Sequence, residues 1–465
     1  QGATGIRDLA VMTPGLYISA ATGTRSGDRI ALRGISTVLP TVGYVGIYID
    51  GMFVPSGSAQ ALELSNVERV EIIKGPQSAI FGRSTLSGAI NYVTKRPGND
   101  WSGRVQASAG EFAHREYVAD LSGPLGEQFA FLLGGRYYER DGAYRNQLSG
   151  RNDVGGQSSR SGTLGLRFTP SDTFEAYLRV LASRDADDAA AVYLQNSLAN
   201  NCLIQNNVPT YYCGRARIDP NGVNVVTANS QVPPSVVVGG MAIATVGTYT
   251  DDGRAGMDRD AARAMLELNW TLGDWRLTSL SGYGAEKTRD AFDLTTRGAF
   301  EYPSTVGLPS LTFDRDIKFK DFQQELRALW DNDGRISAFG GLYYFKSKRT
   351  EFLPYRALPQ ADAGRLEATN TAVFGRVQFD VTQELSIAAE ARYQEDKVDY
   401  FNASNFVPGT TTPLTAEAKT RRFLPRVTVD YNVTDDAMVY ALFSKGNRPV
   451  TINTAPELAF CTERQ

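Results

Sequence analysis

The chain has 465 residues, a formal net charge of -3 and a pI near 5.6, so it lacks the basic character of proteins that bind nucleic acid. Mean hydropathy is -0.27 and no run of about 20 apolar residues occurs, which excludes a membrane protein built from helices. A transmembrane β-barrel leaves no such run, because its strands alternate between lipid and lumen. The content of 45 Gly, 22 Tyr and 22 Phe suits β-structure with aromatic girdles, and it also suits a large soluble all-β protein.

The front of the chain, residues 1 to 98, mixes short apolar runs with many glycine-containing turns. Asp50-Gly51 is a common turn pair and by itself a weak signal. Further turns or close backbone approaches are expected at three glycines, namely Gly75, Gly82 and Gly88.

Within this front region, Val67–Lys74 alternates imperfectly between apolar and charged residues. Inside a polar lumen such charges would pair with a surrounding wall, because buried charges must be paired or hydrated. Pairs of this kind can exchange with water when the domain moves, which suits a gate. The alternative is a set of ordinary surface ion pairs on an α/β domain. The charged members are Glu68, Arg69, Glu71 and Lys74.

From Trp101 onward the pattern changes to long alternating strands. Between 173 and 181, Phe174 and Leu178 point one way while Tyr177 and Arg179 point the other. Period-two alternation over about ten residues is the length that a tilted strand needs to cross a bilayer, whereas soluble strands are usually shorter. The same pattern recurs at 373–381, 385–394 and 426–433.

The connections between these strands also alternate in length. Tight turns are predicted at 123–126, 169–172, 273–274, 331–334, 382–384 and 434–436. Long polar loops are predicted near 141–160, 184–258, 290–315, 349–367 and 400–418, with Glu111–Arg115 as a short exception. Short turns on the periplasmic rim and long loops outside are the signature of an outer-membrane barrel.

Roughly thirteen strands are expected between 101 and 447. Single-chain bacterial barrels have even strand numbers, and an open sheet edge in lipid is costly, so an odd count predicts a fragment that stops in an external loop. A miscounted strand is the alternative. Cys461 would lie in that last loop, with its partner in the missing part.

The close pair Cys202 and Cys213 predicts a disulfide that closes a loop in an oxidising compartment. His114 is the only histidine, which argues against Ser-His, zinc-protease and haem sites. The glycine-rich stretch 82–88 lacks the Lys-Ser/Thr ending of a phosphate loop. The acidic stretch 183–188, which includes Asp187, is interpreted as a solvated loop, with calcium binding as the alternative. We therefore predict no catalytic residue, no metal site, no cofactor and no enzymatic activity.

Five motifs in the front region resemble, in order and spacing, the plug of TonB-dependent receptors of the siderophore-receptor type. They are Gly5–Leu16, Ile30–Ile35, Val45–Gly51, Asn66–Pro76 and Ile80–Pro97. The resemblance implies that residues 1–98 form a small α+β plug domain and residues 99–465 form part of a transmembrane β-barrel. A barrel of about 22 strands with a plugged lumen is the expected whole. The signal peptide and the energy-coupling peptide that precede the plug in this family are not in the sequence, so the chain is expected to be incomplete at both ends.

The function implied by the resemblance is active transport across the outer membrane of a Gram-negative bacterium. The receptor would capture a scarce ligand, with a ferric siderophore as the first expectation, and admit it to the periplasm as a monomer. Its expected partners are TonB with the inner-membrane energising complex, outer-membrane lipid, lipopolysaccharide and a small-molecule iron chelate. Corrinoids, oligosaccharides and aromatic compounds are alternative ligands. A non-energised porin or adhesin barrel and a soluble β-rich binding protein or enzyme are rival interpretations, and the plug motifs argue against the barrel without a plug.

The resemblance also assigns candidate residues. Ligand contacts are expected on the external loops of the plug, with simple packing against the barrel as the alternative, at Arg33, Tyr44, Phe53, Val54 and Ser56. Gating contacts and plug-motif positions are expected at Arg33, Gly34, Asp50, Gly51, Glu68, Arg69, Glu71, Lys74, Gly75, Pro76, Gly82, Gly88 and Asn91. Weaker ligand candidates in external loops are Tyr193, Tyr211 and Tyr212.

Overall fold

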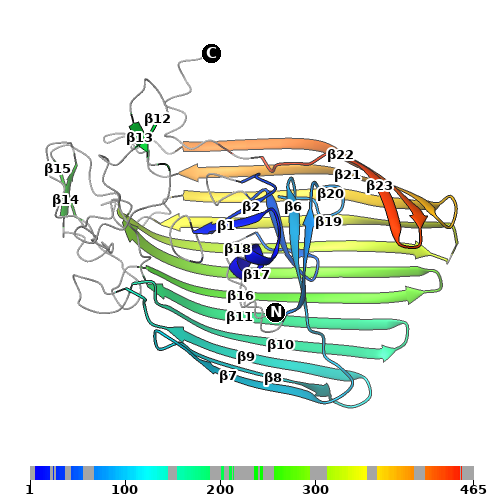
Figure 1. Ribbon diagram of the computed structural model, residues 1–465, viewed down its shortest axis with the longest axis horizontal. Helices are drawn as coiled ribbons and strands as arrows, with labels where there is room; N and C mark the ends of the chain where they lie inside the picture. The colour runs from blue at the N-terminus through cyan, green and yellow to red at the C-terminus, as the bar shows by residue number, and fades with distance from the viewer. Residues whose placement is uncertain are drawn as a thin grey trace.

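The computed structural model describes residues 6–20, 25, 28–36, 43–55, 67–144, 154–188, 201–203, 209–211, 213, 235–238, 241–244, 256–293, 312–332, 334–352, 364–402, 414–450 and 452. Its largest element is a single antiparallel sheet of thirteen strands, which we call the wall (Figure 1). Each strand pairs with the next long strand along the chain, which confirms the predicted meander and its strand count. The wall strands are β7 (Ser102–Ala109), β8 (Arg115–Pro124), β9 (Phe129–Arg140), β10 (Gln157–Ser171), β11 (Phe174–Asp188), β16 (Gly256–Leu272), β17 (Trp275–Asp293), β18 (Thr312–Asp331), β19 (Ile336–Phe352), β20 (Gly364–Asp380), β21 (Leu385–Asn402), β22 (Leu414–Thr434) and β23 (Ala437–Ser444).

The two faces of the wall differ in the way that the alternation predicts. On the inner face the side chains of Arg179, Arg259 and Arg392 are almost completely buried. On the outer face Leu342 and Phe423 are 59% and 60% exposed. A sheet in water would place its charges outside and its leucines inside, so this inverted pattern is typical of a wall that faces lipid on its outer side.

The connections confirm the predicted sorting by length. At one end of the wall every connection has two or four residues, such as Gly273-Asp274 between β16 and β17. At the other end the connection between β7 and β8 has five residues, and the rest have eleven or more. The strands run farther than expected at this second end, so that β11 includes 184–188, which were predicted as loop. Two short hairpins lie in the connection after β11, made of β12 (Cys202–Leu203) with β13 (Pro209–Tyr211) and β14 (Ser235–Val238) with β15 (Met241–Ala244).

The residues before the wall form a small α+β unit, which we call the plug. It contains helix α1 (Ile6–Met12) and the hairpin of β1 (Leu16–Ala20) and β2 (Asp28–Leu32). No helix in the described parts of the chain is long and apolar enough to cross a membrane. A second sheet has the order β4-β3-β6-β5, with β3 parallel to β6. Its strands are β3 (Val45–Ile49), β4 (Met52–Phe53), β5 (Val67–Lys74) and β6 (Gly88–Thr94).

One glycine is required where β5 and β6 begin to pair. Gly88 has φ +154°, and a Cβ at this position would lie 2.3 Å from the carbonyl oxygen of Ile73. Only a residue without a side chain lets the two strands approach this closely. This is the close backbone approach predicted for Gly88.

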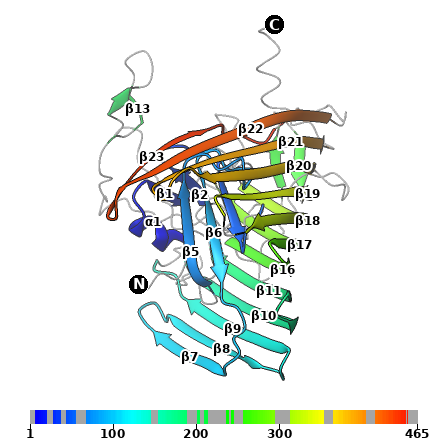
Figure 2. The ribbon, with the colours of Figure 1, turned by 90° about the vertical axis from the view of Figure 1, so that its right-hand side faces the viewer.

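The plug lies within the curve of the wall, against its inner face (Figure 2). An apolar core holds the plug together around Leu32, Ile90 and Tyr92, and it continues into the wall through Met265 and Leu280. The front hundred residues are therefore not an independent globule beside the sheet.

Candidate functional site at the plug–wall interface

The Asp50-Gly51 turn joins the plug to the wall through a buried ion pair. Both residues have positive φ, +49° and +78°, which a tight two-residue hairpin turn requires. The Asp50 carboxylate accepts hydrogen bonds from the backbone N–H (2.8 Å) and the hydroxyl (2.6 Å) of Thr94. It also forms an ion pair with Arg179 of β11, in which the side chains of Arg179 and Asp50 are only 2% and 12% exposed. We call these three residues the Asp50 cluster.

The same turn continues across the plug sheet as a chain of hydrogen bonds. The N–H of Gly51 donates to Oδ1 of Asn91 (3.0 Å), and Nδ2 of Asn91 donates to Oε2 of Glu71 (3.0 Å). The hydrogen bond from Asn91, followed by Arg69, lowers the pKa of Glu71 despite an opposing effect of burial. The turn that contacts the wall is thereby linked to β5 at the far edge of the sheet.

Among the described residues the charges of β5 make no ion pair with the thirteen wall strands, so the gating role expected of this strand stays a prediction. Arg69 pairs with Glu71 (2.9 Å) and Glu68 (3.3 Å), its own neighbours, and Glu68 and Arg69 are more than half exposed. Lys74 makes no ion pair within the described residues. β5 is the edge strand of the plug sheet and pairs only with β6. The alternative interpretation, ordinary surface ion pairs, describes Glu68 and Arg69.

A second cluster binds Arg25 of the plug to the end of β11 that lies near the long connections. The guanidinium of Arg25 contacts Asp187 (2.6 Å) and Asp185 (3.5 Å). Asp185 also forms an ion pair with Arg259 of β16 and accepts a hydrogen bond from Ser159 (2.6 Å). The stretch 183–188 is therefore not a solvated loop, because cross-strand pairing places its two inner carboxylates beside arginines. No group of three metal-ligating side chains was found among the described residues.

A third cluster surrounds Arg392 on β21. Its guanidinium lies against Gly82, where φ is +80° and a Cβ would stand 2.7 Å from Cζ. Nε of Arg392 donates to Gln394 (2.8 Å), and Nη2 donates to Asn370 (3.3 Å). Both amides donate in turn to Asp396, at 2.7 Å and 2.9 Å. Gly82 thus leaves room for a buried wall arginine, and its expected role in gating stays a prediction.

Two further contacts continue the interface along β22 and β23. Nη1 of Arg426 donates to the side chain of Gln77 (3.0 Å) and to Glu390 (3.2 Å). The carbonyl of Pro76 accepts from the hydroxyl of Ser444 (3.2 Å). Gly75, a predicted motif residue with φ +100°, directly precedes Pro76 in the chain.

Phe53 and Val54 pack against the wall, so the packing alternative holds for these two proposed ligand contacts. The backbone of Phe53 makes two hydrogen bonds with the side chain of Gln323, at 3.2 Å and 2.8 Å. The ring of Phe53 contacts Tyr48 and Phe345 at centroid distances of 5.6 Å and 5.8 Å, and Val54 is 4% exposed. The hydroxyl of Tyr48 donates to the carbonyl of Phe81 (2.9 Å), and burial raises the pKa of Tyr48 well above its usual value.

The remaining ligand candidates are more open. Arg33 is exposed and has φ +54°, followed by Gly34 with φ +79°. Tyr44 is half-buried, and the Arg448 guanidinium lies 5.6 Å from the centre of its ring. Ser56, Tyr193, Tyr212 and Cys461 lie outside the described residues, as does the side chain of Tyr211.

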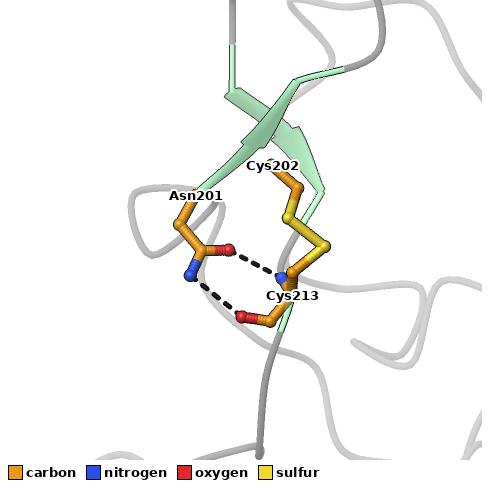
Figure 3. Close-up of a disulfide and its surroundings, with 3 residues drawn as sticks. All are labelled: Asn201, Cys202 and Cys213. Carbon is orange, nitrogen blue, oxygen red and sulfur yellow. Dashed lines mark hydrogen bonds between the residues drawn. A yellow bond between two sulfur atoms is a disulfide. The ribbon is translucent and has the colours of Figure 1, made fainter.

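Cys202 and Cys213 form a disulfide (Figure 3). The side-chain amide of Asn201 brackets Cys213, since it donates to the carbonyl (2.9 Å) and accepts from the N–H (2.6 Å). The bridge closes the hairpin of β12 and β13 in the long connection after β11.

The wall arginines were not singled out from the sequence. Among the residues that the structure describes, the largest fully buried side chains are those of Arg179, Arg259 and Arg392. The available signal was their place on the polar side of alternating strands, which fixes the face but not the partner.

Two family descriptions match the chain. "TonB-dependent Receptor Plug Domain" matches residues 1–89, and "TonB dependent receptor-like, beta-barrel" matches residues 210–459. The pesticin receptor of Yersinia enterocolitica is 24% identical over 98% of this chain and 60% of its own length. The ferrioxamine B receptor of Salmonella typhimurium is 31% identical over 29% of this chain and 20% of its own length.

Solved structures share the fold. The ferric yersiniabactin uptake receptor from Yersinia pestis superposes with a TM-score of 0.72 at 20% identity, over 94% of this chain and 61% of that one. The ferric-catecholate import receptor from Escherichia coli K12, in its closed form, gives a TM-score of 0.68 at 16% identity, over 96% of this chain and 63% of that one. The chain therefore spans about 60% of the relatives that it matches. Since residues 210–459 alone make up 250 of its 465 residues, the chain belongs to the TonB-dependent receptor family.

Proposed function

We propose that this chain is the plug and the first part of the barrel of an outer-membrane transporter that takes up a ferric siderophore with energy from TonB. The named relatives support this ligand class, since they include a ferrioxamine B receptor and a ferric yersiniabactin uptake receptor. The proposal places the protein in the outer membrane of a Gram-negative bacterium. It divides the chain near residue 98 into plug and barrel, and it takes the complete barrel to have about 22 strands.

The observation that carries the proposal is the polar character of the plug–wall interface. Arg179, Arg259 and Arg392 are buried in ion pairs or hydrogen-bond networks, two of them directly against plug residues. A buried ion pair stabilises little compared with apolar packing, because desolvation offsets much of the attraction. When water enters, each partner regains hydration. An interface of this kind holds a plug in one position and still lets it leave.

The ligand would arrive from the end with long connections, which faces outside in barrels of this type. On the plug, Arg33 and Tyr44 are the proposed contacts, together with Ser56. Arg33 offers a cation in a left-handed turn, and the Tyr44 ring beside Arg448 offers an aromatic surface. Iron chelates that carry carboxylate or catecholate groups would be complementary to these side chains.

The test is uptake of a panel of ⁵⁵Fe-labelled chelates by cells that express the full-length receptor containing this chain. The proposal expects uptake of at least one ferric siderophore that stops when TonB is deleted or the proton-motive force is collapsed. Uptake that continues at the same rate without TonB would contradict the energised mechanism. Uptake of a corrinoid or an oligosaccharide in place of every iron chelate would keep the transporter class and change the ligand.

A further inference from the structure

The disulfide of Cys202 and Cys213 lies outside the paired part of the wall. Strands β11 and β16, which flank it in the chain, pair without a gap up to Asp188 and Gly256, at the end with the long connections. The bridge therefore belongs to the connection between these strands and not to the sheet. In the proposed outer-membrane orientation this end faces outside, so the finished receptor holds both cysteines away from the periplasm.

The hairpin around the bridge is built from local contacts. Its two cysteines are 11 positions apart, and β12 pairs with β13 inside the loop that the bridge closes. The side-chain amide of Asn201 makes two hydrogen bonds with the backbone of Cys213, at 2.9 Å and 2.6 Å (Figure 3). The disulfide, the strand pair and the amide contacts all join residues between 201 and 213. None of these contacts needs a wall strand to bring the two sulfurs together.

An unfolded chain also favours this pair over a pair with Cys461. The probability that a flexible loop closes falls with roughly the 3/2 power of the number of residues that it encloses. Cys202 and Cys213 are 11 positions apart, whereas Cys461 lies 248 positions beyond Cys213. Chain entropy therefore favours the short loop by about a hundredfold. Oxidation before the barrel assembles would select the observed pair without help from the fold.

We propose that Cys202 and Cys213 are the substrate of a periplasmic dithiol oxidase, which closes the bridge before the barrel assembles. This inference rests on the proposed outer-membrane location, because only a chain that passes through the periplasm meets such an enzyme. The bacterial periplasm is kept oxidising by enzymes of this class and not by a redox buffer. Cys213 is exposed even in the closed hairpin, which gives an enzyme access to it. The alternative is oxidation outside the cell after assembly, by oxygen or by small disulfides.

The reaction transfers two electrons from the chain to the enzyme. The thiolate of Cys213 attacks the disulfide of the enzyme, so that a mixed disulfide forms and one enzyme sulfur leaves as a thiolate. The thiolate of Cys202 then attacks the Cys213 sulfur, which forms the bond of the bridge and releases the second enzyme sulfur. The two protons lost by the cysteines end on the two thiols of the reduced enzyme.

The experiment counts free thiols on the newly made full-length receptor by pulse labelling in cells. Acid stops thiol exchange, and a PEG-maleimide then adds a resolvable mass to each free cysteine of the denatured chain. Cys202→Ser/Cys213→Ser is the matched control, because two extra labels on the parent receptor report this pair in the reduced state. In cells depleted of the barrel-assembly machinery, we expect the parent to carry no more labels than the control. Deletion of the periplasmic dithiol oxidase, without oxygen or added disulfides, should slow closure at least about tenfold.

Two extra labels in assembly-blocked cells that contain the oxidase would overturn the proposal, because the bridge would then form after assembly. Equal rates of closure with and without the oxidase would overturn it too, because they would indicate another oxidant. Iron uptake is measured in the strain that contains both the oxidase and the assembly machinery. Late closure with intact energised uptake refutes the oxidase proposal alone, whereas early closure with no energised uptake refutes the transport proposal alone.

Discussion

Arg179 of the wall and Asp50 of the plug form an ion pair across the interface of the two units, although 129 positions separate them in the chain. Arg179 also donates to the carbonyl of Lys95 (2.6 Å), the residue that follows the end of β6. One wall side chain therefore binds both the Asp50-Gly51 turn and the segment that leaves β6, and Thr94 links these two parts of the plug through its hydrogen bond to Asp50. The contact therefore fixes the plug sheet against β11.

Removing one partner of this pair should loosen the plug. Asp50→Ala leaves a buried guanidinium without its carboxylate, which costs about 3–5 kcal/mol for a pair of this burial. Amide hydrogen exchange in β3 and β6 is expected to accelerate. In the double variant with Arg179→Ala the cost should be less than the sum of the two single changes.

The exposed pair of Arg184 and Asp260 provides the control, because both side chains are 64% exposed on the outer face. Asp260→Ala should change stability by less than about 1 kcal/mol. Similar exchange rates in Asp50→Ala and Asp260→Ala would show that the Asp50 cluster does not anchor the plug.

Gly82→Ala should push the plug away from β21. The new methyl group would combine left-handed backbone strain with a contact 2.7 Å from the Arg392 guanidinium. Gly126→Ala is the matched control, since Gly126 has φ +96° and nothing within 4 Å of its Cβ position. We expect the control to cost about 1 kcal/mol and Gly82→Ala to cost more, as measured by denaturant unfolding in detergent. Equal costs would mean that Arg392 moves aside freely.

Phe53→Ala should act on stability and not on ligand recognition. It removes a buried ring from between Tyr48 and Phe345, which typically costs about 3–5 kcal/mol. Arg33→Gln should lower the affinity for the ligand and leave stability unchanged, because Arg33 is exposed and its substitution removes only a charge. The check is to measure the melting temperature without ligand and the Kd for the transported chelate on both variants. A lower affinity in Phe53→Ala at unchanged melting temperature would restore Phe53 as a ligand contact.

Glu71 should make the stability of the plug depend on pH. The hydrogen bond from Asn91 lowers the pKa of Glu71 in the folded plug below the ordinary value of 4.5. A lowered folded pKa means that this contribution is complete above the unfolded pKa and is lost as pH falls through the folded one. The difference in melting temperature between wild type and Asn91→Ala should therefore be smaller at pH 3 than at pH 7, and the part that remains reflects the hydrogen bond from Gly51 to Asn91. The same difference in melting temperature between the two proteins at every pH would contradict the role of Glu71.

The sequence predicted the wall well because its signal is local and repeats with a fixed period. Tyr177 and Arg179 fall on the inner face wherever the strand begins, since alternation alone decides the face. The strand count and the sorting of the connections follow from the same period and from turn residues such as Gly273-Asp274.

The interface could not be predicted in the same way, because it depends on which strands lie beside which plug segment. Asp187 was interpreted as part of a solvated loop, yet it meets Arg25 across 162 positions of sequence. The charges of Val67–Lys74 were expected at the wall, and the sheet order places them at the far edge. Phe53 was expected to touch ligand, and its contact with Gln323 spans 270 positions. A single sequence contains no signal for such partners.

The most direct test of the central claim, that the plug leaves the wall during energised uptake, uses a buried plug residue as a reporter. Ser78 is fully buried, and its hydroxyl accepts a hydrogen bond from the N–H of Asn447 beyond β23 (3.0 Å). Ser78→Cys would be probed with a water-soluble maleimide in living cells, and the receptor without this substitution would serve as the control for labelling of its other cysteines. We predict slow labelling at rest and labelling several-fold faster when both the ferric ligand and TonB are present. Equal rates with and without TonB would contradict the claim.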